Sequence, residues 1–189
     1  MLDYDFKTAT YNIAKHEAGH WLCANSLGWS PRDIVVRVPS HPKGHYGYAL
    51  NAYRTSLAGI EDVREYSMGR VKVLYSGAYA ENFNGDDFDH DQVMSDLMRG
   101  GGANSDFLKA EEIYFFYYNC LSNPRGWEIE FNPIICDVQL LIDMRYHFID
   151  AVGRKFEKLA YQMGQELTMT RDELIKIYQD SPIRLSHGT

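Results

Sequence analysis

Near the start of the chain, apolar residues recur every three or four positions, which is the spacing of one face of an α-helix. The pattern predicts a helix over residues 8–27, whose apolar positions include Ile13, Ala14, Ala18, Trp21 and Leu22. Thr8 or Thr10 can cap the start of this helix with a side-chain oxygen. Gly28 can end it in a left-handed turn, and Pro31 blocks any continuation.

β-branched residues replace the helical pattern after this first helix. The segment DIVVRV, residues 33–38, is rich in valine and isoleucine and predicts a strand. A turn-rich break follows, and YGYAL, residues 46–50, can return as a second strand. The two segments together predict a small β-hairpin.

Helical patterns dominate the rest of the chain. The predicted helices cover residues 60–84, part of the acidic segment 85–103, a stretch from Asn104 or Ser105 to about Cys120, residues 134–167, and a last stretch from the cap Thr170 to about Gln179. The 134–167 pattern fits one helix or two joined near Gly153, and residues 122–133, with two prolines, are expected as a loop. The predicted fold class is therefore mainly α with a small β-hairpin.

The composition fits one folded domain of 189 residues, of which 45% are hydrophobic. The net charge is −7 and no block of lysine and arginine offsets it, so nucleic-acid binding is not expected. Three widely spaced cysteines without a CxxC motif, and a start that lacks the features of a secretion signal, predict reduced thiols and a cytoplasmic location. No apolar run approaches about 20 residues, so no membrane segment is expected.

The candidate chemistry lies in AKHEAGHWL, residues 14–22, which contains the motif HExxH. Helical residues four apart lie about 6 Å apart along the axis and on one side, so His16 and His20 can direct ring nitrogens at one zinc ion. Glu17 lies about 100° round the helix from His16, where it can take a proton from a water held by the zinc. HExxH peptidases divide the roles in this way. The alternative is an ordinary helix that happens to carry two histidines.

A catalytic zinc site usually has three protein ligands and an open position. Spacing alone does not choose the third ligand among the downstream acidic and histidine side chains. The candidates are Glu81, Asp86, Asp87, Asp89, His90, Asp91, Asp96 and Asp106.

Four motifs, in order, resemble those of the FtsH family of zinc metallopeptidases. They are AKHEAGHWL, IVVRVPS…YGYAL, VLYSGAYAENFNG and GGANSDFLKAEEI, and the C-terminal LAYQMGQELTMTRDELIKI is similar more weakly. The resemblance implies a single zincin-like metallopeptidase domain over residues 1–189, with its catalytic part in 8–120 and C-terminal helices in 134–180. It also implies that Asp106 is the third zinc ligand, because Asp106 aligns with the ligand of the family's Gly-Ala-Ser-Asn-Asp-Leu segment.

The resemblance suggests roles for two further parts of the chain. Glu81 aligns with a helix glutamate of the family and is expected to accept a hydrogen bond from a ligand histidine, with a role as third ligand as the alternative. The strand that contains Val36 and Val38 could be a sheet edge that aligns an extended substrate through main-chain hydrogen bonds. A plain structural strand is the alternative.

The expected function is zinc-dependent hydrolysis of peptide bonds in unfolded or flexible protein segments. The chain has no G-x-x-x-x-G-K-[ST] motif, so a separate ATPase partner stays open, as does a homo-oligomer. The alternatives are a regulatory peptidase that cuts one specific protein and a zinc-stabilised binding module that does not cleave. Glu17 favours an enzyme, because a purely structural zinc site does not need this residue.

Overall fold

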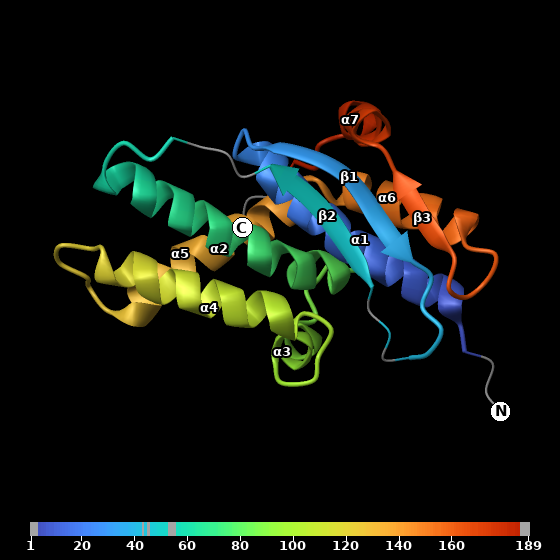
Figure 1. The fold of residues 1–189 in the computed structure, drawn as a ribbon, viewed down its shortest axis with the longest axis horizontal. Helices are drawn as coiled ribbons and strands as arrows, with labels where there is room; N and C mark the ends of the chain where they lie inside the picture. Colours follow the sequence, from blue (N-terminus) through green and yellow to red (C-terminus); the bar gives the residue numbers. More distant parts are fainter. Residues whose placement is uncertain (1–3, 43, 45, 53–55, 186–189) are drawn as a thin grey trace.

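The computed structural model describes residues 4–42, 44, 46–52 and 56–185, which form seven helices and three strands (Figure 1). The helices are α1 (Phe6–Ser26), α2 (Ile60–Glu81), α3 (His90–Leu97), α4 (Asn104–Asn119), α5 (Trp127–Met144), α6 (Tyr146–Leu159) and α7 (Arg171–Asp180). The strands are β1 (Ser30–Arg37), β2 (Gly47–Ala52) and β3 (Glu166–Met169). The prediction of a mainly helical protein with a small hairpin is confirmed, and the hairpin gains a third strand.

The first helix begins slightly earlier than predicted because Asp5 caps it. Oδ1 of Asp5 accepts hydrogen bonds from the backbone N–H groups of Lys7 and Thr8, both at 3.1 Å. The expected caps, Thr8 and Thr10, therefore lie inside the helix. The expected end is confirmed, since Gly28 has a φ of 72°, which is the left-handed region.

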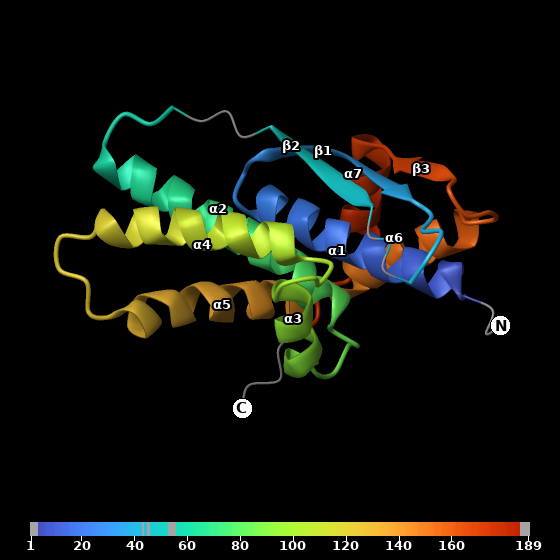
Figure 2. The same ribbon diagram turned by 60° about the horizontal axis from the view of Figure 1, so that its bottom comes forward.

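Helix α1 runs through the middle of the molecule. The sheet covers one side of it, and α2 and α6 pack against its other sides (Figures 1 and 2). All of its residues from Ile13 to Ala24 are buried. A Cβ on Gly19 would lie 2.3 Å from the carbonyl oxygen of Ser76, so a glycine is needed for α1 and α2 to approach this closely. The motif residues of α1 are thus placed inside the fold, between the sheet and α2.

The three strands form an antiparallel sheet in the order β2-β1-β3. Val36 of β1 pairs with Gly47 on one side and with Leu167 on the other, so β1 is the central strand. Its side chain is fully buried, and the backbone N–H and C=O of the buried Val38 bond to residues 165 and 164. The prediction that this strand is a sheet edge is therefore wrong, and Val36 and Val38 are core residues that an extended substrate cannot pair with. The edge strands are β2 and β3.

The C-terminal part departs most from the prediction. Helix α5 begins at Trp127, inside the expected loop, and it contains Pro133. The break between α5 and α6 falls at Arg145 and not near Gly153. Gly153 lies inside α6, where an added Cβ would be 2.7 Å from the ring of Tyr11. This glycine therefore serves the packing of α6 on α1 and does not end a helix.

Strand β3 lies where the sequence pattern suggested the end of a long helix. Leu167 and Met169 are buried and alternate with exposed residues, but four residues are too few for this alternation to stand out. The segment becomes a strand because it pairs with β1. The predicted capping box of the last helix is confirmed: the backbone N–H of Thr170 donates to Glu173, and the Thr170 hydroxyl accepts from the Glu173 N–H.

One hydrophobic core joins the helices to the sheet. It includes Trp21 of α1, Val36 of β1, Leu74 of α2, Tyr114 of α4 and Phe148 of α6. None of the helices in the described part of the chain combines the length and the apolar character that crossing a lipid bilayer requires.

Candidate metal centre

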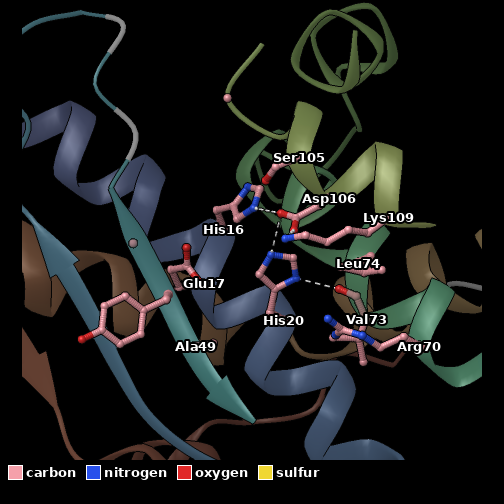
Figure 3. Close-up of a pocket in the computed structure, with 13 residues that line it drawn as sticks. His16, Glu17, His20, Ala49, Arg70, Val73, Leu74, Ser105, Asp106 and Lys109 are labelled. Atoms are coloured by element: carbon pink, nitrogen blue, oxygen red, sulfur yellow. Dashed lines mark hydrogen bonds and ion pairs between the residues drawn. The ribbon is translucent and has the colours of Figure 1, made fainter. Parts of the chain in front are cut away.

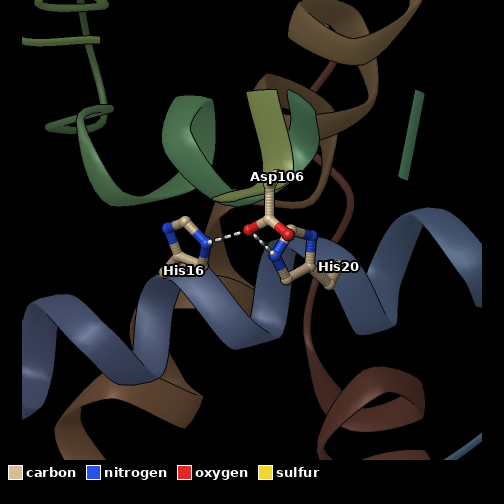
Figure 4. Close-up of side chains that lie close together, drawn as sticks. All are labelled: His16, His20 and Asp106. Atoms are coloured by element: carbon tan, nitrogen blue, oxygen red, sulfur yellow. Dashed lines mark hydrogen bonds and ion pairs between the residues drawn. The ribbon is translucent and has the colours of Figure 1, made fainter. Parts of the chain in front are cut away.

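His16 and His20 lie one turn apart on the face of α1 that packs against α2 (Figure 4). Both are buried, with exposures of 1% and 8%. Their rings stand nearly perpendicular, with centroids 4.7 Å apart. The i,i+4 spacing thus presents both imidazoles to the same point, as the motif predicts.

Gly77 of α2 makes room for these two rings. An added Cβ would lie 2.5 Å from Nε2 of His16 and 2.6 Å from Cε1 of His20, which is closer than real Cβ contacts come. The two imidazole rings lie directly against Gly77, so any side chain at this position would displace them.

Asp106 comes from the first turn of α4 and reaches the two histidines from the opposite side (Figure 4). Its Oδ2 atom lies 3.4 Å from Nε2 of His16 and 3.3 Å from Nε2 of His20. The N-cap of α4 is Ala103, and not Asn104 or Ser105 as predicted. The helix therefore has no side-chain cap, and its first turn carries the carboxylate that meets the histidines.

The two separations between Oδ2 of Asp106 and the ring nitrogens are long for hydrogen bonds and equal those of neighbouring ligands on a tetrahedral metal. N–H···O bonds have donor–acceptor distances of about 2.7–3.2 Å. Ligand atoms on a tetrahedral zinc with bonds of about 2.05 Å lie about 3.3 Å from one another. The observed separations of 3.3 and 3.4 Å match the second value. In the part of the chain that the structure describes, these residues form the group that could hold a metal ion, with ligand atoms within 4.8 Å of one another.

The far nitrogen of each ring fixes its tautomer. Nδ1 of His20 lies 2.6 Å from the carbonyl oxygen of Val73, which can only accept, so this nitrogen carries the hydrogen. Nδ1 of His16 lies 3.1 Å from Oε2 of Glu81, and a carboxylate likewise accepts. In the neutral rings both Nε2 lone pairs therefore face Asp106. Two lone pairs and a carboxylate oxygen can face one another only when protons or a cation lie between them.

The pKa shifts of His16 and Asp106 also indicate that the cluster favours a positive charge between its members. Burial lowers the pKa of His16, but hydrogen bonds to Asp106 and Glu81 outweigh it, and the pKa rises from 6.5 to about 10. Burial raises the pKa of Asp106, yet its hydrogen bonds to His16 and His20 hold that pKa well below the usual range. The site thus strongly favours positive charge between these groups, and a divalent metal ion supplies such charge.

Glu17 lies beside the cluster but turns away from it, toward strand β2 (Figure 3). It is only 4% exposed, and the backbone N–H of Ala49 donates to its carboxylate. A Cβ on Gly47 would lie 2.7 Å from Oε1 of Glu17, so this glycine makes room for the carboxylate. Burial raises the pKa of Glu17, and the neighbouring histidines offset this only in part. A carboxylate with a raised pKa is suited to taking and returning a proton.

The three candidate ligands and Glu17 open onto one cleft of about 290 Å³ (Figure 3). Residues 47–49 of β2 line one side, and Arg70, Ser105 and Lys109 line the other parts. A second cavity of about 550 Å³ adjoins it at Gly102 and is lined by Glu81 and Asp96, among others. The sequence predicted β2 as a strand but gave neither β2 nor Lys109 a place in the site, although Lys109 follows Asp106 at the i+3 spacing that places two residues on one helix face.

The structure separates the proposed roles of the acidic residues. His16, His20 and Asp106 come together as predicted, with Glu17 beside them. Glu81 contacts the far nitrogen of His16, the position expected for a residue that supports a ligand histidine, and it lies outside the described ligand cluster. The remaining candidates were Asp86, Asp87, Asp89, His90, Asp91 and Asp96, and none of them belongs to the described ligand cluster.

The chain was also compared with known proteins. No protein-family model matches it, and a search of curated proteins finds no match.

Proposed function

We propose that this protein is a zinc-dependent endopeptidase with a zincin-like, FtsH-like site. His16, His20 and Asp106 hold the metal, and Glu17 moves the proton. The observation that carries the proposal is the spacing of 3.3 and 3.4 Å between the Asp106 oxygen and the two ring nitrogens, next to a buried glutamate. The order of the four motifs along the chain supports it.

His16, His20 and Asp106 would hold a zinc ion, which would supply a Lewis acid for a peptide carbonyl and lower the pKa of a bound water to about 7. The Glu17 carboxylate accepts a proton from the water that attacks the carbonyl carbon, and later returns this proton to the leaving amine nitrogen. The hydrogen bond from Ala49 and the space at Gly47 hold the carboxylate in place for both transfers. A purely structural zinc site would gain nothing from a buried acid at this point.

Strand β2 takes the role that the sequence suggested for β1. In the described sheet β2 is an edge strand, and its residues Gly47, Tyr48 and Ala49 line the cleft. An extended peptide segment can add to such an edge through main-chain hydrogen bonds. This mode suits unfolded or flexible segments, because folded proteins do not present a free extended backbone.

The test is Glu17→Gln, which keeps the size of the side chain but cannot accept the proton. We expect the variant to bind zinc as the wild type does, by metal analysis after dialysis, and to lose cleavage of fluorescein-labelled casein. Glu65→Gln, an exposed glutamate of α2, is the matched control and should cleave normally. Asp106→Asn should lose zinc.

Zinc-loaded wild type that cleaves no casein, or that behaves as Glu17→Gln does, would favour a non-catalytic zinc-stabilised module. Cleavage at one site in a single protein of a whole proteome, without casein cleavage, would instead identify a regulatory peptidase.

A further inference from the structure

Lys109 lies beside the candidate metal ligands, and a role in binding the metal does not explain its position. It lies one turn after Asp106 on α4, and its side chain extends over the cluster toward Asp106 (Figure 3). Its Nζ atom lies 3.9 Å from Oδ1 of Asp106, the oxygen that does not face the histidines. The side chain is 58% exposed, so its ammonium group can adjust within the cleft.

An ammonium group at this place opposes metal binding, because two cations repel each other across a few ångströms. An exposed i,i+3 ion pair with Asp106 contributes little stability in return. The position suits an anion that appears in the cleft during a reaction. Removing a donor from such an oxyanion site typically lowers kcat by about 100- to 1,000-fold.

We infer that Lys109 is a further catalytic residue, whose ammonium group stabilises the negative charge that develops on the carbonyl oxygen of the scissile peptide bond. The inference rests on the proposed peptidase function.

The charge arises in a defined step. As the water oxygen bonds to the carbonyl carbon, the π-electron pair of the C=O bond moves to the carbonyl oxygen, and the water proton moves to Glu17. The electron pair then re-forms the C=O bond, the C–N bond breaks, and the amine nitrogen takes the proton from Glu17. The attraction between Lys109 and the oxygen strengthens as the oxygen gains negative charge, so the contact lowers the barrier more than it favours substrate binding.

The distance is compatible with this role. A carbonyl oxygen held beside Oδ2 of Asp106 would lie within reach of the flexible Lys109 side chain, whose Nζ atom is 3.9 Å from Oδ1 of the same carboxylate. Catalytic hydrogen bonds are often long before substrate binds and shorten in the complex.

The experiment compares zinc-loaded wild type, Lys109→Met, Lys109→Arg and Lys176→Met on one peptide that spans a mapped casein cut. Lys176 is an exposed lysine of α7, away from α4, and its variant controls for loss of one positive charge (Figures 1 and 2). We expect Lys109→Met to lower kcat by about 100-fold, with KM within about threefold of wild type. Zinc affinity should be equal or tighter, Lys109→Arg should recover part of kcat, and Lys176→Met should match wild type.

The outcomes separate the two proposals. A wild type that holds zinc but cleaves nothing overturns the peptidase function and this inference with it. An active wild type whose Lys109→Met variant has an unchanged kcat overturns this inference alone. A variant whose loss of activity follows a loss of zinc, or a rise in KM, also overturns it, because Lys109 would then serve metal or substrate binding.

Discussion

Substitution of Gly77 by alanine is the most direct test of the proposed metal centre, because Gly77 lies against both candidate ligand rings and has no side chain that could take part in the chemistry. The added Cβ would lie 2.5 Å from Nε2 of His16, about 0.9 Å inside the 3.4 Å at which ordinary contacts begin. Its distance to Cε1 of His20 would be 2.6 Å. Zinc–ligand bonds tolerate only about 0.2 Å of variation. Both rings cannot retreat that far and keep the metal.

The expected magnitude follows from these distances. Disturbing a ligand's support typically costs about 10- to 100-fold in metal affinity, and the two rings here are displaced directly, so we expect a loss of about 100-fold or more for Gly77→Ala. At a given zinc concentration, a 100-fold loss of zinc affinity reduces the free energy by which zinc stabilises the folded protein by about 2.7 kcal/mol. For a chain of this size, the zinc-induced rise in Tm should therefore be about 5–10 °C smaller in Gly77→Ala than in the wild type.

The stability of the metal-free protein should change less, by about 0–2 kcal/mol. Overpacking costs about 1–3 kcal/mol, and the better helix propensity of alanine returns about 1 kcal/mol. The assay is thermal unfolding with and without zinc, together with zinc competition against a chelating dye. Gly69→Ala is the matched control in the same helix, because its Cβ would meet only the ends of the Trp29 and Leu27 side chains, at 3.1 and 3.2 Å. If Gly77→Ala holds zinc as tightly as Gly69→Ala does, the metal is not bound between His16 and His20.

Three further predictions follow from the contacts around the site. Gly47→Ala should crowd the Glu17 carboxylate and lower kcat while zinc content, measured by metal analysis, stays at the wild-type level; equal losses of both would contradict this. Lys15→Met should remove the hydrogen bonds that the buried ammonium group donates to the carbonyl oxygens of Glu81 and Phe83, at 2.8 and 2.7 Å. This loss should destabilise the metal-free protein by about 1–3 kcal/mol in denaturant unfolding; unchanged stability would show that these bonds contribute nothing. The raised pKa of His16 stabilises the metal-free fold below pH 6.5, and this contribution should be lost as pH rises through about 10. The Tm of chelator-treated protein should therefore fall over that pH range, and the Tm of zinc-loaded protein should fall less. Parallel Tm curves would refute the assignment of His16 as a metal ligand.

Local chemistry explains why much of the site could be predicted from sequence. His16, Glu17 and His20 belong to one helix, and the helical repeat alone decides that the two imidazoles share a face while the carboxylate lies round the side. The placing of Asp106 came from the resemblance of its segment to a known family, since spacing alone left eight candidates. The capping box of the last helix was likewise visible, because its two partners are three residues apart.

Tertiary packing decided which segments that are distant in the sequence come into contact. Four residues of alternating pattern did not reveal β3. Its pairing with β1 makes β1 the central strand, with Val36 in the core, and leaves β2 as the described edge strand that lines the cleft. The small size of Gly77 was plain in the sequence, but its contact with two imidazoles depends on how α2 packs on α1. Asp106 and His16 are 90 residues apart along the chain, and their approach depends on α4 packing against α2. Sequence periodicity determines which side chains share a face, because it follows from the geometry of one helix. Which faces meet is decided by the burial of the whole chain's apolar surface, and that is a property of the folded molecule.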